Sequence, residues 1–309
     1  MVGGAKSVKI KSSFNDRVFG VTNAALLTFS LLVVLYPLYF VLIASISEPY
    51  AVGAGVVRFL PVGFTLEGYI NVFRNSDIWI GYRNAVYYTI CGTAISLFMS
   101  IPTAYALSKK KLPFRTGISI YFLFTMYFGG GLIPYYLLVR WLNLVNQPYT
   151  MIVLGSVSVF HIVVTRTYFQ TSIPEELYEA AYIDGASELW SFTRVAIPLA
   201  APIIAVITLY NAVGRWNDYF SALIFLSNKN YFPLQLILRG ILTQNQRATA
   251  DIIITSSNAQ EFREKARLAY IAESMKYALI YIASAPMLIL YPFVQKHFVK
   301  GVMIGSLKG

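Results

Sequence analysis

The sequence predicts an all-α membrane protein, and two observations support that prediction. Hydrophobic residues make up 57% of the 309 residues and charged residues only 13%, whereas soluble domains carry about 25% charged residues. The chain also contains six long uncharged runs, each about as long as a bilayer-spanning helix, which needs roughly 20 residues. Because hydrocarbon cannot hydrate free backbone groups, and these runs lack strand-like alternation, helices are favoured over a closed barrel.

The six runs, numbered as spans one to six, cover residues 18–47, 84–108, 116–139, 141–165, 195–214 and 277–295. Span one is too long for the apolar part of a signal peptide, and no small-residue cleavage site follows it, so we expect it to remain as an anchor. The predicted organisation is a basic lead-in (1–19), a first transmembrane helix (20–47), an extracytoplasmic segment (48–83), a five-helix core (84–298) that includes a cytoplasmic segment (173–194), and a C-terminal tail (299–309).

The formal net charge of +11 does not indicate nucleic-acid binding, because the cations flank apolar runs instead of forming a soluble basic face. Basic clusters precede span one and separate spans two and three: Lys6, Lys9, Lys11, Arg17, Lys109, Lys110, Lys111 and Arg115. Both segments are therefore predicted to be cytoplasmic, and an even number of spans places both termini there, in the cell (inner) membrane. The loop between spans five and six is also basic, so this orientation rests on the two N-terminal clusters.

The residue types that usually carry chemistry are sparse. The single Cys91 and the distant His161 and His297 offer no metal-ligand spacing, and the chain has neither GxxxxGK[ST] nor GxGxxG. We therefore assign no catalytic residue, no metal and no cofactor to this chain. Energy for any transport must come from an ion gradient or from another subunit.

Span three contains Gly129, Gly130, Gly131 and Pro134, which predict an unwound or kinked helix. Irregular backbone within a membrane persists where it is buried in protein or faces a watery cavity, so Gly130 and Tyr135 are candidates for a transport path. The alternative is that the glycines end the span at the outer surface, with nearby aromatic residues forming an interfacial belt.

The segment between spans four and five predicts a short helix-turn-helix. Pro174 followed by acids is typical of a helix start, and Gly185 suits the turn because glycine adopts positive φ readily. Five carboxylates lie in this segment: Glu175, Glu176, Glu179, Asp184 and Glu188. An amphipathic helix that binds anionic lipid would instead carry Lys and Arg, so an acidic docking element for a basic groove on a soluble subunit is favoured, with small Ala180 and Ala181 permitting close approach.

At these residues the chain resembles the permease subunits of binding-protein-dependent ABC importers, in the carbohydrate (maltose-type) group. The signature of that family is EAA, three residues, G, nine residues, then I-x-L-P, and here Glu179, Ala180 and Ala181 precede Gly185 and the sequence VAIP at 195–198. Val195 and Ile197 are the only departures from the pattern. The likeness extends through GGLIPYYLL (130–138), GRWNDYFSALIFL (214–226) and the C-terminal YPFVQKHFVKGVMIGSLKG, which is similar to permeases for oligosaccharides released from complex polysaccharides.

The resemblance implies a type I importer permease fold with six transmembrane helices and a cytoplasmic coupling helix. It also implies partners: a second homologous permease subunit, an ATPase dimer that binds ATP and Mg, an extracytoplasmic sugar-binding protein, and an oligosaccharide substrate. The implied ATPase-coupling residues are Glu175, Glu176, Glu179, Ala180, Ala181, Asp184, Gly185 and Ala186. Residues 259–276, expected to include a surface helix, would meet the sugar-binding protein.

Span five offers candidate contacts for sugar, which binds through aromatic faces and hydrogen-bonding side chains. Thr208, Asn211, Arg215 and Asp218 fall at helical spacing as one polar stripe. The candidate path residues are Gly130, Tyr135, Asn211, Arg215, Trp216, Asn217, Asp218 and Tyr219. Charged groups in a span are costly, so Arg215 and Asp218 face the bundle or form a structural i,i+3 pair. His161 is predicted to be a hydrogen-bonded residue of the bundle.

Two other classes of function stay open at this point. An ion-gradient-driven secondary carrier would account for the charges in span five and the broken span three, and it would transport without an ATPase. A membrane receptor or scaffold would show no flux in any assembly. The absence of a detectable inverted repeat argues against the carrier.

Overall fold

The computed structural model describes residues 14–243, 269–270, 272–273, 275–289 and 292. Throughout these residues the ordered elements are helices and no strand occurs, which confirms the predicted all-α class. The basic residues 6–11, most of the surface helix expected at 259–276, and the tail 299–309 lie outside the described residues.

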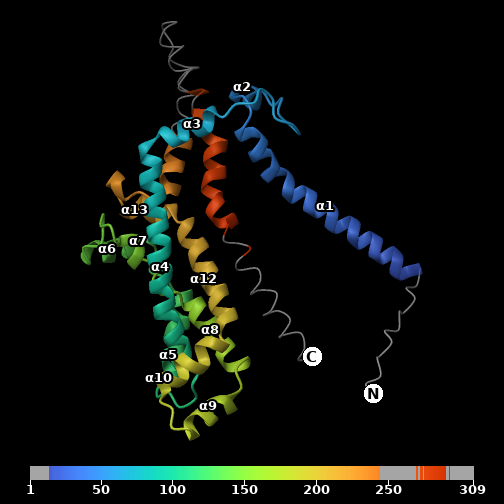
Figure 1. The fold of residues 1–309 in the computed structure, drawn as a ribbon. Coiled ribbons are helices and arrows are strands. Elements are labelled where there is room, and N and C mark those ends of the chain that lie inside the picture. The colour runs from blue at the N-terminus through green and yellow to red at the C-terminus, as the bar shows by residue number, and fades with distance from the viewer. Residues whose placement is uncertain (1–13, 244–268, 271, 274, 290–291, 293–309) are drawn as a thin grey trace.

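The first helix stands away from the rest of the molecule (Figure 1). Helix α1 (Phe14–Ser45) begins before the predicted start at residue 20, and only Ile43, Ala44 and Ser45 at its end are buried. Two short helices follow, α2 (Pro49–Gly53) and α3 (Glu67–Arg74), the latter strongly amphipathic as expected for an interfacial helix.

The longest helix of the core, α4 (Ser76–Ser108), is the element on which the others pack. It begins earlier than the predicted residue 84 because Asn75 caps it, with its Oδ1 accepting a hydrogen bond from the Asp77 N–H at 3.0 Å. Its small Ser96, Ser100 and Ala104 are fully buried, which lets α8 and α12 approach the α4 backbone closely.

Two of the predicted spans are interrupted. Helices α5 (Arg115–Tyr127) and α6 (Leu132–Trp141) meet at a bend of 114°, which confirms the break predicted in span three. The uncharged run 141–165 was expected to be one span, and that expectation is wrong: it contains α7 (Thr150–Val153) and the start of α8 (Val159–Thr171), separated near Gly155, whose φ is +71°.

The rest of the core continues through short, bent helices. Helices α9 (Glu175–Ile183) and α10 (Glu188–Ser191) form a hairpin, followed by a π-helical turn (Phe192–Ala196) and α11 (Ile197–Leu199). A 78° bend then leads into α12 (Ala201–Trp216), and α13 (Tyr219–Phe225) and η2 (Lys229–Tyr231) come next. Two apolar helices, Leu234–Thr243 and Met275–Ile289, complete the core.

Helix length alone does not confirm six continuous spans. Among the described residues two helices are long and apolar enough to cross a bilayer, or four if each bent pair counts as one crossing. The remaining apolar segments are shorter helices packed against α4 and α12. The lengths of the uncharged runs therefore indicated which segments are embedded in the membrane. They did not indicate where the helices within those segments break.

Candidate functional site

The α9–α10 hairpin (residues 175–191) lies at the end of the bundle opposite α2 and α3 (Figure 1). Its turn is a Schellman motif: the Ala186 N–H donates to the Ala181 carbonyl at 2.9 Å, and the Gly185 N–H donates to the Tyr182 carbonyl at 3.0 Å. Gly185 has φ +77°, a conformation that side chains with a Cβ rarely adopt. The predicted helix-turn-helix and the role of its glycine are thus confirmed.

Both arms of the hairpin are attached to the end of α4 through one side chain, Tyr105. The Tyr105 hydroxyl donates to Glu188 Oε2 at 2.9 Å, which holds α10. The Tyr105 ring also contacts the rings of Tyr178 in α9 and Phe192 in the π-helical turn, with centroids 6.0 and 4.9 Å apart. The hairpin and α4 are therefore expected to move together.

The lysines after α4 form a second attachment. Lys110 Nζ lies 2.8 Å from Glu175 Oε2, and this hydrogen bond raises the pKa of Lys110 and lowers that of Glu175. Lys109 Nζ lies 3.1 Å from the centroid of the Tyr178 ring. Burial lowers the pKa of Lys109 and raises that of Tyr178 to about 12, so Tyr178 is a neutral phenol at physiological pH.

These contacts were not foreseen from the sequence, where the lysine cluster indicated only topology. They place the cluster and the hairpin at the same end of the bundle, as expected if both face one compartment. They also show that two of the five predicted docking carboxylates, Glu175 and Glu188, bind groups of this same chain. Charge complementarity between the two acidic and basic segments was the sequence signal for this attachment.

Large apolar side chains near the turn of the hairpin are open. Tyr182 and Ile183 are 77% and 83% exposed, and Leu189 in α10 is exposed as well. The Tyr182 ring also lies 5.6 Å from Lys111 Nζ. Around them lie the exposed carboxylates Glu176, Glu179 and Asp184. Ala181 is only 7% exposed and packs into its own bundle, while Ala180 is exposed, so only Ala180 is positioned for the close approach predicted for both alanines. An apolar tip ringed by carboxylates is typical of a protein interaction site.

The candidate path residues at the C-terminal end of α12 fall on two faces, and the face that carries Asn211 and Arg215 of the predicted polar stripe points to the interior. Asn211 Nδ2 lies 3.1 Å from His161 Nδ1, which confirms His161 as a hydrogen-bonded residue of the bundle. Arg215 Nη1 donates to the carbonyls of Met151 at 2.8 Å and Leu154 at 3.4 Å, holding the α7 region against α12.

The Arg215 side chain depends on a glycine in α4. A Cβ at Gly92 would overlap the Arg215 guanidinium, so glycine is needed for this close approach. Asp218 does not form the i,i+3 ion pair considered for it, because it caps α13 by accepting a hydrogen bond from the Ser221 N–H at 3.0 Å. Asn211, Arg215 and Asp218 therefore have structural partners within the subunit.

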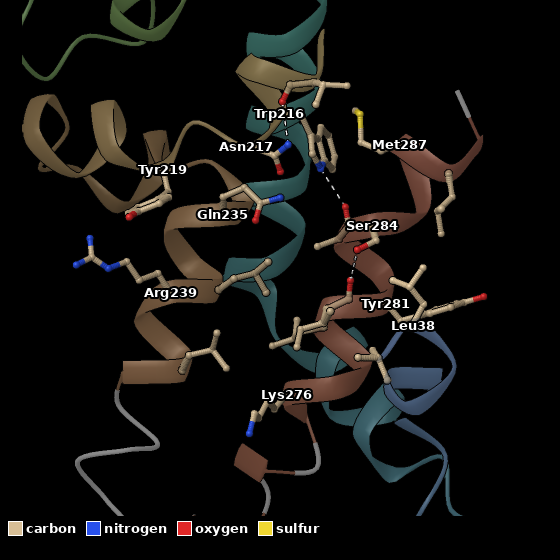
Figure 2. Close-up of a pocket in the computed structure, with 18 of the residues that line it drawn as sticks. Leu38, Trp216, Asn217, Tyr219, Gln235, Arg239, Lys276, Tyr281, Ser284 and Met287 are labelled. Carbon is tan, nitrogen blue, oxygen red and sulfur yellow. Dashed lines mark hydrogen bonds between the residues drawn. The ribbon is translucent and has the colours of Figure 1, made fainter. Parts of the chain in front are cut away.

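The second face of α12 opens into a cavity of about 950 Å³ (Figure 2). Trp216, Asn217 and Tyr219 line it, together with α1 and the helices Leu234–Thr243 and Met275–Ile289. Trp216 is 2% exposed and its indole Nε1–H donates to the Ala283 carbonyl at 2.9 Å, which fixes the ring at the cavity wall. Polar lining residues that sequence reasoning missed are Gln235, Arg239, Thr243, Lys276 and Ser284.

The two candidates from span three lie elsewhere. Gly130 is in the break between α5 and α6, and Tyr135 packs edge-on against Phe225 of α13 with centroids 5.7 Å apart. The neighbouring Tyr136 stacks on the same ring at 5.9 Å. Neither Gly130 nor Tyr135 lines the 950 Å³ cavity. The fold thus does not bring the eight candidate path residues to one cavity, although Tyr135 lies close enough to Asp218 for an electrostatic interaction. Within the described residues, no cluster of His, Cys, Asp and Glu has the arrangement of a metal site.

Comparison with known proteins gives a consistent result. Residues 78–304 match the family described as "Binding-protein-dependent transport system inner membrane component". Protein LplC of Bacillus subtilis (strain 168) is 33% identical over 95% of this chain and 96% of its own length. From the same organism, the polygalacturonan/rhamnogalacturonan transport system permease protein YtcP is 34% identical over 92% of this chain and 96% of its own.

A solved structure is similar over almost the whole chain. One chain in the crystal structure of a bacterial ABC transporter involved in the import of the acidic polysaccharide alginate superposes with a TM-score of 0.81 at 35% sequence identity. The match covers 94% of this chain and 100% of the other.

Proposed function

This chain belongs to the family of binding-protein-dependent transport system inner membrane components, and from that premise we propose that it imports an oligosaccharide. It is a multi-pass membrane permease subunit of an ABC importer and not an enzyme, since ATP hydrolysis in such importers is carried out by a separate subunit. The observation that carries the proposal is the α9–α10 hairpin, which presents an apolar tip at one end of the bundle while its base is bound to α4.

The substrate class follows from the relatives and the cavity together. The similar proteins are named for transport of polygalacturonan or rhamnogalacturonan and for import of alginate, which are polysaccharides. The cavity offers an aromatic wall at Trp216 and Tyr219 and an amide at Asn217, the groups that stack on sugar rings and replace hydrogen bonds to water. The relatives do not support the alternative of an ion-gradient-driven carrier.

The hairpin is proposed to be the site where the ATPase docks. Its exposed Tyr182 and Ile183 would enter a groove on the ATPase, and Glu176, Glu179, Ala180 and Asp184 would contact the groove walls. Glu175, Ala181, Gly185 and Ala186 would hold the hairpin in shape and attach it to the bundle. Movement of the ATPase dimer would then reach α4 through Tyr105, as a rigid-body change of the helix bundle.

The remaining partners are proposed from surfaces left open in the single chain. Helix α1 and the α5–α6 pair expose long apolar faces, which suit a second homologous permease subunit as well as lipid. A sugar-binding protein would meet the end that carries α2 and α3, and ATP and Mg would bind to the ATPase subunits. In this arrangement the hairpin and both termini are cytoplasmic. Residues 1–19 and 299–309 would be the cytoplasmic tails. Residues 20–47 would be the anchoring helix, 48–83 the extracytoplasmic segment and 84–298 the permease core.

Among the path candidates, we assign direct sugar contact to Asn217 and Tyr219, because they line the cavity, and Trp216, which is 2% exposed, would support the wall behind them. Asn211, Arg215 and Asp218 would support the path from within the subunit. Gly130 and Tyr135 would allow the α5–α6 break to change angle when the path opens.

The proposal is tested by reconstituting this chain with its co-purified ATPase and second permease and measuring ATPase activity stimulated by the sugar-loaded binding protein. Glu179→Lys is expected to lower that stimulation because a like-sign charge would then face the basic groove expected on the ATPase. Asp16→Lys, at the exposed start of α1, is the matched charge-reversal control and is expected to retain stimulation. Flux in liposomes driven by an ion gradient without any ATPase would overturn the proposal.

A further inference from the structure

We propose that the cavity beside α12 selects an anionic oligosaccharide, of the class that carries a carboxylate on its sugar rings, through Arg239 and Lys276 at its rim. The inference rests on the proposed function of oligosaccharide import and names the class of the substrate. Both cations line the 950 Å³ cavity, and no Asp or Glu occurs among the described residues that line it.

Arg239 and Lys276 lie on apolar helices of a membrane protein, where a charged side chain is costly without a partner or water. A Lys or Arg near the centre of a spanning segment costs about 2.5–3.5 kcal/mol on insertion scales, and such residues usually face a partner or a watery cavity. In the part of the chain that the structure describes, no carboxylate lies within ion-pair distance of Arg239. Arg239 lines the cavity at its open edge, where its side chain is exposed beside Tyr219 (Figure 2).

The position of Arg239 is defined by an aromatic ring. Its Cζ lies 5.1 Å from the centroid of the Tyr219 ring, and Figure 2 shows the two side chains together at one edge of the cavity. A guanidinium held over a ring keeps its in-plane N–H donors available, and those donors match the two oxygens of a carboxylate. Tyr219 therefore orients Arg239 without using up its hydrogen-bonding capacity.

Lys276 lies at another edge of the same cavity (Figure 2). Its Nζ is 3.4 Å from Glu273 Oε1, so Lys276 is paired within the chain, as Lys110 is paired with Glu175 at the hairpin. Arg239 is the cation of the rim without a described carboxylate partner. An unbalanced rim at the cavity fits a ligand that brings its own negative charge.

The rest of the wall suits the sugar rings themselves. Trp216 and Tyr281 provide aromatic surface, and Asn217 and Gln235 provide amides between the two cationic edges. A neutral oligosaccharide would need only these groups. The cations are the additional feature, and they indicate a uronate-containing chain.

The test uses the assembled importer with its binding protein in proteoliposomes. The probes are tetragalacturonate and tetramannuronate, each compared with its neutral methyl ester, and uptake is expressed as the ratio of acid to ester. Because the same binding protein delivers to every variant, comparing this ratio between variants cancels the preference of the binding protein itself.

The expected result is that Arg239→Gln lowers the acid-to-ester ratio about tenfold, the effect of losing one charge-assisted contact. Lys276→Gln should lower it less, since Lys276 is already paired with Glu273. Arg239→Lys should recover part of the ratio, which separates charge from folding. Lys229→Gln, an exposed cation in η2 that does not line the cavity, is the matched control and should leave the ratio unchanged.

Three outcomes would overturn the inference. The first is an unchanged ratio in Arg239→Gln, and the second is wild-type uptake of neutral oligosaccharides with no uptake of either uronate. The third is cross-linking of Ser284→Cys in the cavity wall to the second permease, which would show that protein fills the space. Oligosaccharide import would stand in the first two cases. Failure of the complex to transport any oligosaccharide would instead overturn the proposed function.

Discussion

The α9–α10 hairpin and the cavity beside α12 are built in opposite ways. At the hairpin, Tyr105, Lys109 and Lys110 at the end of α4 hold both arms through a hydrogen bond, ring contacts and an ion pair. At the cavity, five helices contribute to the wall, and Arg239 has no described carboxylate partner. The difference teaches that polar groups at the base of the hairpin are partnered within the chain, as the proposed transmission of motion requires, while Arg239 at the cavity is not, as the proposed ligand contact requires.

The change expected to damage the hairpin most is Gly185→Val. A β-branched residue at φ +77° costs about 1–3 kcal/mol of local strain and opposes the Schellman turn. If that strain is added to the activation free energy of the coupled step, sugar-stimulated ATPase activity should fall by about tenfold or more. The cavity should be unaltered. Gly20→Val, in α1 at a glycine with open space and no positive φ, is the control. Full stimulation in Gly185→Val would show that the turn is not a mechanical element.

The next largest effect is expected between the two regions, at Gly92. Because a Cβ there would overlap the Arg215 guanidinium, Gly92→Ala should lower the free energy of unfolding by about 1–3 kcal/mol through overpacking. The measurement is thermal unfolding of the purified complex. Gly214→Ala, next to Arg215 and with open space around it, should not lower stability, because Ala is favoured over Gly within a helix by about 0.5–1 kcal/mol. Equal stability of the two variants would show that Arg215 is not tightly held.

A smaller effect is expected from removing one hydroxyl at the base of the hairpin. Tyr105→Phe keeps the ring contacts and loses the 2.9 Å hydrogen bond to Glu188. The lost bond should lower the free energy that holds α10 to α4 by about 1 kcal/mol. We expect the number of sugars imported per ATP hydrolysed to fall several-fold while sugar affinity is unchanged. Tyr87→Phe, on an exposed part of α4, is the control. A loss of sugar affinity without a loss of coupling would remove the distinction between the two regions.

The smallest effect is expected at the exposed Lys110–Glu175 pair. The pKa of Glu175 is lowered by Lys110, so the pair stabilises the fold at neutral pH and that contribution disappears as pH falls through the lowered pKa. The pKa of Lys110 is raised, so on the alkaline side the contribution disappears as pH rises through that raised value. In Lys110→Gln the free energy of unfolding should therefore fall less steeply than in wild type as the pH is lowered, and high salt should reduce this difference between the two proteins. If the free energy of unfolding has the same pH dependence below neutrality in both proteins at low salt, the ion pair is contradicted.

The sequence predicted the hairpin well because its signals are local. A proline and acids at the start of a helix, a glycine at the turn and a fixed spacing to the following proline all act within a few residues. The prediction that His161 is hydrogen-bonded within the bundle also held, because few alternatives are open to a polar side chain in a span.

The grouping of the candidate path residues was predicted less well, because it depends on which helices pack against each face of α12. Helical spacing grouped Asn211 and Arg215 with Asp218, yet α12 ends at Trp216 and Asp218 caps the next helix. Gln235, Arg239 and Lys276 reach the same cavity from helices far along the chain, and no local pattern marks them as neighbours.

By itself the sequence determined that this chain is embedded in a membrane, that its segments are helical, and that an acidic helical hairpin follows the fourth apolar run, because length, hydropathy and turn chemistry act locally. Only the tertiary structure decided that the lysines after α4 bind the hairpin, that Arg215 lies over Gly92, and that the cavity has a cationic rim. Those outcomes depend on contacts between distant segments, which helix packing and crossing angles set and which periodicity within one segment does not contain.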